Sequence, residues 1–437
     1  RVAEEFKDYP ELFFVYHCDS RGRVYPSTTG VSPQGSDLQK AMLEFAHGKQ
    51  VKGKVATEWF LINGANKFGF DKAPLAERAT WHMDKALLLL SFADDPVNNQ
   101  GWQEADKPFQ FLAWCFEYAE WFRTGSVCSH LPVGLDGSCS GLQHLSAMLR
   151  DEIGGRAVNL TPSAEMQDIY KYVADAATAR MQADAPDDED KARYRSIWLA
   201  HGINRKVTKR MTMTTPYGVT QRSAVKYVIE DYLKVMPEFN KADHYGLASY
   251  LVSHAWPAIG DVVIKGRKAM AWLTGAAKAI IKAGADTDGA ITWRTPSGFL
   301  ASQMYCEFEE HRVATKLVGH ARIKAVTATG EIDGSRHATG MAPNFVHSMD
   351  ASHLHMVAEA MERAVPGAPL AFIHDDMGTH AADTQALYHI IREQFVDMYV
   401  NNKPLEELNA AYPMTTPPPE EGTLDLSGIL ESEYAFS

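Results

Sequence analysis

The chain contains few cysteines and no long apolar run. Its five cysteines show no CxxC spacing, which argues against a zinc site and against a disulfide framework, so we expect a reducing compartment. The longest apolar runs, such as ALLLLSFA after Lys85, are much shorter than the roughly 20 residues that a membrane span needs. No membrane topology is expected. The start at Arg1, without Met or a secretory leader, indicates a processed chain or a piece of a longer one.

The chain also lacks overall positive charge. Its net charge is −12, which is unusual for a protein that binds nucleic acid. From Arg205 to Lys324, however, 18 Lys and Arg stand against 10 Asp and Glu. Such a basic region is either a chance fluctuation of surface charge or a phosphate-binding surface.

The length and hydrophobic pattern predict a mixed α/β, helix-rich protein with two or three structural units. At 437 residues the chain exceeds one ordinary domain, and its 45% hydrophobic and 22% charged residues are typical of a globular protein. No internal repeat is visible.

One apolar segment predicts a strand that ends in an aspartate. Leu131, Val133 and Leu135 alternate with other residues, which favours a strand ending at Asp136, and helical spacing follows over 142–149. An Asp at a strand end is more often a turn former or a helix cap than a metal ligand.

A second segment has the reverse order. A helix is predicted over 354–361, then LAFI leads as a strand into His374 and Asp375, and a further helix is expected from Thr384 to about Tyr399. If this strand and the one before Asp136 are neighbours in one sheet, the two carboxylates could share a metal ion.

A mainly helical insertion separates these two segments. Helices are predicted over 164–181 and from about 192 past Arg205, with an acidic loop between them. Pro216 disfavours helical geometry at the residue before it, so the basic helix should end there, just ahead of Tyr217 and Gly218.

The basic helix carries cations at helical spacing. Arg205 and Lys209 are four residues apart and could grip neighbouring phosphates, and Lys206 and Arg210 repeat the spacing on the adjacent face. Taken alone, such a run is more often a solvated face. His347 has a similar ambiguity: a lone His is usually structural, but an imidazole or a phenol can read a ribose 2′-hydroxyl.

Several long motifs carry a resemblance to a known family. They are DSRGRVYP, FEYAEW, LDGSCSGLQHLSAMLRDEIGGRAVNL, MAPNFVHSMDASHL and IHDDMGT. With them the chain resembles the single-subunit DNA-dependent RNA polymerases of bacteriophages and mitochondria, the phage branch above all. The resemblance runs from Asp19 to the terminal LESEYAFS.

The resemblance implies a role for each site residue, and all are given in this chain's numbering. Two Mg²⁺ ions would be held by Asp136, the Gly137 carbonyl and Asp375, and His374 would brace the turn. Lys209 would be catalytic and protonate pyrophosphate, and the triphosphate would be bound by Arg205 and Arg210. Ribose would be selected by Tyr217 and His347, and the template or hybrid would be contacted by Arg21, Arg23 and Gly218.

The resemblance also implies a right-hand architecture. Residues 1–9 would end a thumb, 10–164 and 348–437 would form a palm with a C-terminal extension, and 165–347 would be fingers. Within them, 312–337 takes the place of the promoter-reading hairpin, and its HARIK bases suggest phosphate contact as much as base reading. The family's N-terminal domain and most of its thumb are expected to be absent.

Two single residues also depart from the family pattern. Asp376 stands where phage enzymes often have Ser, and Ser437 replaces a terminal Ala. The partners implied are a DNA template, an RNA product and ribonucleoside triphosphates. The chain would work as a monomer within a longer polypeptide, in the cytoplasm of a phage-infected cell.

Three other functions compete with RNA synthesis. A DNA polymerase of the Pol I type shares the basic helix, but it carries a Glu that blocks the ribose 2′-hydroxyl where this chain has Gly141. It also has His-Asp-Glu in place of His-Asp-Asp. A non-catalytic remnant would usually lose metal ligands, and a nuclease has no use for Tyr217.

Overall fold

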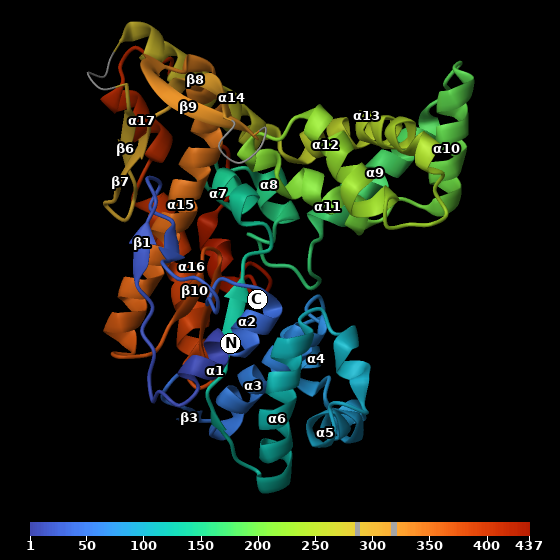
Figure 1. Cartoon of the computed structure of the whole chain (residues 1–437), viewed down its shortest axis with the longest axis vertical. Helices are drawn as coiled ribbons and strands as arrows, with labels where there is room; N and C mark the ends of the chain where they lie inside the picture. The colour runs from blue at the N-terminus through green and yellow to red at the C-terminus, as the bar shows by residue number, and fades with distance from the viewer. Residues whose placement is uncertain (285–288, 316–320) are drawn as a thin grey trace.

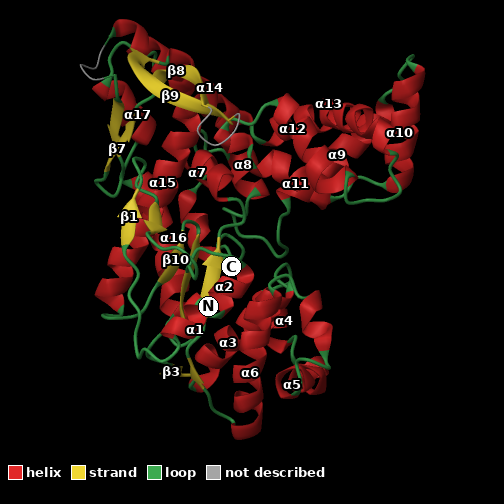
Figure 2. Ribbon diagram, viewed as in Figure 1, coloured by secondary structure: helices red, strands yellow, loops and turns green. Residues whose placement is uncertain are grey.

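Helices dominate the protein, as expected for the mixed α/β, helix-rich class. A computed structural model describes residues 1–284, 289–315 and 321–437. Figure 1 shows a tall body and, at its upper right, a helical lobe that projects sideways. Figure 2 shows that strands are few and lie in the body and at its upper end.

A small antiparallel sheet joins the two segments that end in aspartate. It contains β5 (Pro132–Asp136), β10 (Ala371–Ile373) and β11 (Asp376–His380), in the order β10-β11-β5. Both predicted strands are therefore confirmed. They are not neighbours, however, because β11 pairs with each of them and lies between them. Strand β11 was not predicted, because its sequence DMGTH does not alternate apolar and polar residues.

The two faces of this sheet differ. Val133, Leu135 and Met377 are buried in the core, where α3 (Gly53–Phe68) and α16 (Thr384–Val400) pack against the strands. The opposite face carries glycines and forms part of the wall of a cavity of about 600 Å³. At Gly134 a Cβ atom would lie 2.5 Å from Asp376 Oδ1, so only glycine leaves room for that carboxylate.

The N-terminal part of the chain lies mainly in the lower body (Figure 1). Its elements are α1 (Val2–Phe6), β1 (Tyr16–Cys18), β2 (Val24–Pro26), α2 (Asp37–Ala41), β3 (Lys49–Gln50), α4 (Leu75–Thr80), α5 (Ala86–Asp94), α6 (Pro108–Thr124) and β4 (Cys128–Ser129). Strands β1 and β2 form one hairpin, and β3 pairs with β4.

The projecting lobe contains most of the predicted helical insertion. Its helices are α9 (Ile169–Ala183), α10 (Glu189–His201), α11 (Arg205–Met213), α12 (Gln221–Val228) and α13 (His244–Val262). The prediction of one helix running past Arg205 is wrong. Gly202 has φ +85° and ends α10, and the Asn204 side chain accepts the Lys206 backbone N–H to start α11.

The remaining elements complete the body. They are α7 (Ser140–Met148), α8 (Glu152–Ala157), α14 (Ile264–Ala283), β6 (Ile291–Arg294), β7 (Leu300–Gln303), β8 (Cys306–Thr315), β9 (Ala321–Ile332), α15 (Gly334–Ala364) and α17 (Pro404–Ala411). Helices α7 and α16 agree with the predicted segments, and α15 starts well before the predicted 354–361.

A long hairpin of β8 and β9 occupies the segment assigned to promoter reading. It begins earlier than the predicted 312, and residues 334–337 belong to α15 instead. The side chains of 312–325, and with them the HARIK bases, lie outside the described residues. A phosphate contact there stays a prediction.

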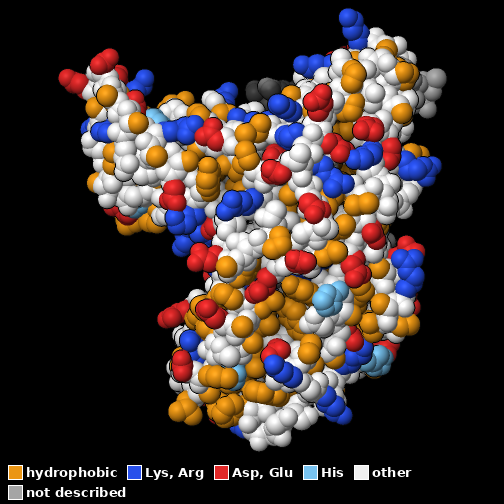
Figure 3. All heavy atoms as spheres, turned by 180° about the vertical axis from the view of Figure 1, so that it is seen from behind, with side chains coloured by type: hydrophobic (Ala, Val, Ile, Leu, Met, Phe, Trp, Pro, Cys, Tyr) orange, Lys and Arg blue, Asp and Glu red, His pale blue; other side chains and the backbone are white. Residues whose placement is uncertain are grey.

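All five cysteines are free. In the described part of the chain no single helix is long and apolar enough to cross a bilayer; a stretch from Lys241 through α13, taken together with α14, has that length and composition, but the two helices meet at a bend of 94°. Seen from behind, side chains of both charges are interspersed over the surface (Figure 3).

Candidate active site

The sheet places three carboxylates at one end. Asp136 ends β5, and Asp376 is its direct register partner at the start of β11. His374 and Asp375 form the two-residue turn between β10 and β11, and His374 has φ +58°, in the left-handed region that such tight hairpin turns use. The turn therefore brings Asp375 to the end of the sheet where Asp136 lies.

These carboxylates affect one another electrostatically. Loss of solvation, followed by the charge of Asp376, raises the pKa of Asp136 to about 7. Loss of solvation and then the charge of Asp136 raise the pKa of Asp375 well above its ordinary value. Like charges held this close are costly when both are ionised, and a divalent cation between them would remove that cost.

The donor set fits a magnesium ion better than a transition metal. Carboxylate and carbonyl oxygens are the ligands that Mg²⁺ prefers, and Mg²⁺ usually keeps several waters. In the described ranges no group of three or more His, Cys, Asp or Glu side chains is arranged to hold a metal ion. An open site of two aspartates and a backbone carbonyl remains compatible with this finding.

The C-terminal segment holds the backbone beside Asp136. Ser437 donates its N–H to the Asp136 carbonyl at 3.1 Å, and Ser138 donates to the Ala435 carbonyl. Within the described residues the Gly137 carbonyl, which is the one expected at the metal, accepts no hydrogen bond. Buried Arg392 in turn donates to the carbonyl of Phe436 at 2.8 Å.

His374, in the turn between β10 and β11, packs against the β2 residue Tyr25. Its ring packs edge-on against Tyr25, with 5.0 Å between ring centroids and 68° between the planes. Burial first, and then the charge of Arg23, lowers the pKa of His374, so the ring is neutral near pH 7. Its Nδ1 atom is buried without a partner among the described residues.

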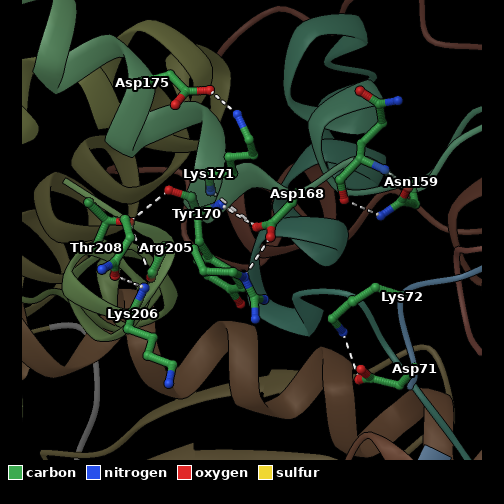
Figure 4. Close-up of polar contacts among 12 residues, drawn as sticks. Asp71, Lys72, Asn159, Asp168, Tyr170, Lys171, Asp175, Arg205, Lys206 and Thr208 are labelled. Carbon is green, nitrogen blue, oxygen red and sulfur yellow. Dashed lines mark hydrogen bonds and ion pairs between the residues drawn. The ribbon is translucent and has the colours of Figure 1, made fainter. Parts of the chain in front are cut away.

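The basic helix α11 lies in the lobe, and two of its arginines are paired internally. Arg205 donates to Asp168 at 2.6 Å (Figure 4), and Arg210 donates to both oxygens of Asp231 at 2.8 and 2.9 Å. Lys206 extends away from the Arg205 pair in Figure 4. Lys209 is exposed and has no ion pair in the part of the chain that the structure describes.

The apolar and hydroxyl face of α11 explains why these cations point outward. Val207 and Met211 are buried, and the Thr208 hydroxyl donates to the Tyr170 carbonyl at 2.7 Å. The helix is therefore attached to α9 along one face. Its charged residues occupy the remaining face, as the sequence spacing predicted.

Tyr217 and His347, which are far apart in the sequence, lie in contact. Their ring centroids are 4.4 Å apart and the rings are inclined by 32°. The Tyr217 hydroxyl lies directly over Gly141, where a Cβ atom would be only 2.9 Å from the hydroxyl oxygen. A side chain at position 141 would displace the ring, so the glycine and the tyrosine form one unit.

The loop that carries Arg21 and Arg23 contacts two residues of helix α15, His347 and Asp350. Arg23 donates to Asp350 at 3.1 and 2.6 Å, and Ser140 donates to the other oxygen of that carboxylate at 2.9 Å. Arg21 donates to His347 Nδ1 at 2.8 Å. Burial tends to raise the pKa of Asp350, but the charge of Arg23 and these hydrogen bonds lower it.

Sequence reasoning missed Asp350, Ser140 and Asp19. Asp350 stands three residues after His347, so the two share a face of α15, and this spacing could have identified it. Asp19 accepts hydrogen bonds from Arg21 and could not have been found without the loop conformation.

The family of this chain is identified by comparison with known protein families. A sequence model of the family described as DNA-dependent RNA polymerase matches residues 50–416. The chain belongs to this polymerase family. The resemblance found from the motifs is thereby confirmed.

Similar polymerases come from phages and from plant organelles. A DNA-directed RNA polymerase of Enterobacteria phage K11 is 36% identical over all of this chain and 53% of its own length. T7 RNA polymerase of Escherichia phage T7 is also 36% identical, over 54% of its length. A chloroplastic/mitochondrial DNA-directed RNA polymerase 2B of Nicotiana tabacum is 34% identical over 43% of its length. The chain spans about half the length of the curated relatives it matches.

Proposed function

We propose that this polymerase chain carries out DNA-templated RNA synthesis, joining ribonucleoside triphosphates to an RNA 3′ end and releasing pyrophosphate. The observation that carries the proposal is the combination of two aspartates at one end of the sheet, Asp136 and Asp375, with a Tyr217–His347 pair over Gly141. The aspartates suit phosphoryl transfer, and the ring pair suits recognition of a ribose 2′-hydroxyl.

The proposed residue roles follow the family pattern. Asp136, Asp375 and the Gly137 carbonyl would hold two Mg²⁺ ions, which when bound would activate the RNA 3′-hydroxyl and stabilise the leaving group. The turn residue His374 would keep Asp375 in place. This assignment is supported by the raised pKa values of both carboxyl groups, which burial causes first, followed by the charge of Asp376 at Asp136 and the charge of Asp136 at Asp375.

The lobe would bind the nucleotide. Arg205 and Arg210 would contact the triphosphate, and Lys209 would donate a proton to pyrophosphate. To do so, Arg205 would exchange its bond to Asp168, and Arg210 its bonds to Asp231, for phosphate oxygens.

The nucleic acid would lie along the carboxylate end of the sheet. Arg21, Arg23 and Gly218 would contact the template or hybrid, and Gly218, with φ +75°, closes the turn after Tyr217. The Arg21 and Arg23 head groups already hold His347 and Asp350, which supports a second, internal role for both.

The architecture would be that of a right hand. Residues 10–164 and 348–437 would be the palm, 165–347 the fingers, and 1–9 the end of a thumb. The shared sheet of β5, β10 and β11 supports one palm built from two segments. The boundary at 347/348 falls within the continuous helix α15. A monomer within a longer polypeptide, acting in the cytoplasm of a phage-infected cell, completes the proposal.

Primer extension tests this function without a promoter. An RNA primer annealed to a DNA template is incubated with the chain, Mg²⁺ and either ribo- or deoxyribonucleoside triphosphates. We expect extension with ribonucleotides, and a Tyr217→Phe change should relax the preference, since one hydroxyl contact to the sugar is lost.

Three results would point elsewhere. Extension with deoxyribonucleotides alone would favour DNA synthesis. Shortening of the primer would favour a nuclease. Absence of any reaction by a folded chain that still binds the duplex would favour a non-catalytic nucleic-acid-binding protein.

A further inference from the structure

Arg21 is an unusual neighbour for a histidine. We propose that Arg21 holds His347 as the neutral tautomer with its proton on Nε2, and thereby sets how strictly ribonucleotides are selected. The inference rests on the ribose-selecting role proposed above for His347 and Tyr217. Arg21 acts through His347, so it is a positioning residue and not a catalytic one.

The chemistry of the contact determines the tautomer. Arg21 Nη1 lies 2.8 Å from His347 Nδ1. A guanidinium has only N–H donors, so Nδ1 must be the acceptor in this hydrogen bond. The single proton of the neutral imidazole is then on Nε2, and that atom remains a donor.

Arg21 is itself held in one orientation. Asp19 accepts from Arg21 Nε at 3.0 Å and from Arg21 Nη2, which is a two-point contact. Asp19 also accepts the backbone N–H groups of Arg21 at 2.9 Å and of Arg23 at 3.1 Å. The loop between β1 and β2 therefore presents the guanidinium to His347 in a fixed direction.

The groups around His347 keep it uncharged. Positive Arg21 and Arg23 and negative Asp19 face it from the β1–β2 loop, Asp350 from its own helix, and the Tyr217 ring from η3 (Thr215–Tyr217). Burial first, and then the two arginines, lowers the pKa of His347 to about 3. The ring should thus present the same Nε2–H donor beside Tyr217 throughout the pH range 6 to 9.

Arg23 provides a matched contrast on the same loop. Its Nε and Nη2 atoms donate to Asp350, and within the described residues it makes no hydrogen bond to His347. The neighbouring arginine therefore stabilises the fold, and Arg21 is the one whose hydrogen bond decides the state of the imidazole.

The test is an Arg21→Met variant, assayed by primer extension with ribo- and deoxyribonucleotides at several pH values. The ratio of the two kcat/KM values measures sugar selection, and general effects of pH on the reaction cancel in it. We expect this ratio to fall roughly fivefold at pH 8, the effect of losing one neutral hydrogen bond.

Rescue by a conservative variant supplies a second readout. In Arg21→Met, burial and the charge of Arg23 still hold the pKa of His347 low, so the ring should stay neutral and the loss of selectivity should be similar from pH 6 to pH 9. Arg21→Lys, which keeps a donor and the charge, should stay closer to the unchanged protein.

Three controls make the result decisive. In a His347→Ala background, Arg21→Met should cause no further loss of selectivity. Tyr217→Phe should lose selectivity equally at every pH. If Arg21→Met fails to fold, Asp19→Asn weakens the same support, keeps the loop hydrogen bonds that an amide oxygen can accept, and should shift selectivity in the same direction.

Some outcomes overturn the inference and leave the polymerase function intact. These are unchanged selectivity in Arg21→Met, or an equal loss in Arg21→Met and Arg21→Lys, measured beside an unchanged protein that does prefer ribonucleotides. If the unchanged protein itself extends no primer or shows no preference, the proposed function fails and this inference fails with it.

Discussion

Two charged regions of this protein differ in whether their charges have partners of opposite sign. At the sheet, Asp136, Asp375 and Asp376 are brought together, and the pKa values of the first two are raised. On α11, Arg205 and Arg210 each already have a carboxylate partner. One region brings like charges together, and the other has its charges paired.

The difference shows how a site can be prepared for two kinds of ligand. The sheet and its turn fix the positions of the acids through the backbone, so the repulsion persists until a proton or a cation binds. The arginines are on long side chains at the surface, where exchanging one carboxylate for a phosphate oxygen costs little. We therefore expect substitutions at the sheet to have larger effects than substitutions on α11.

The largest expected effect is at the sheet. Asp136→Asn and Asp375→Asn should each reduce primer extension by roughly 1,000-fold or more, since each would remove a ligand that supports several kcal/mol of metal stabilisation. Thermal melting with and without Mg²⁺ gives a second measurement. Mg²⁺ should raise the Tm of the unchanged protein and raise it less in either variant.

Asp376→Asn is the matched control for these two changes, because it removes a neighbouring charge from the same end of the sheet. Extension that persists unchanged in Asp136→Asn or Asp375→Asn would contradict the assignment of metal ligands. A loss in Asp376→Asn as large as theirs would show that Asp376 is a ligand too.

The next effect tests a charge pair that is buried and satisfied. Arg23→Met leaves Asp350 buried without its partner, so the free energy of unfolding should fall by about 3–5 kcal/mol. Chemical denaturation measures this. The double change Arg23→Met with Asp350→Leu should recover much of the loss, because no isolated charge remains. Failure of the double variant to recover would show that the pair does more than neutralise itself.

The smallest effect is expected on α11. Asp168→Asn keeps an N-cap for α9 but removes the charge that holds Arg205, so the KM for ribonucleoside triphosphates should fall by roughly two- to threefold. Arg205→Gln should raise it, by roughly tenfold. Equal KM values in all three proteins would remove Arg205 from the triphosphate site. Asp231→Asn, at the Arg210 pair, provides the parallel comparison.

Much of the local structure could be predicted from the sequence. The strand before Asp136, the strand before His374 and the helix from Thr384 all have clear periodicity and occur as expected. The break at Gly202 was missed because apolar spacing continues across it, although the positive φ of that glycine marks the end of α10.

The sequence could name candidate site residues but not the contacts among them. Motifs identified Tyr217, His347 and Gly141 separately, yet their packing depends on α15 and η3 meeting in space. The hydrogen bond from Arg21 to His347 joins residues 326 positions apart, and no local pattern encodes such a contact. The family resemblance assigned Arg21 to nucleic acid, and the fold gives it this additional partner.

The sequence by itself determined the family, the mixed α/β class and the residue types available for chemistry, because periodicity and motif spacing are local properties. Tertiary structure decided which charges face one another. It placed β11 between the two predicted strands, set Asp376 opposite Asp136, and paired Arg205 with Asp168. Electrostatic interactions depend on distance and solvation, and both are established only when remote segments pack together.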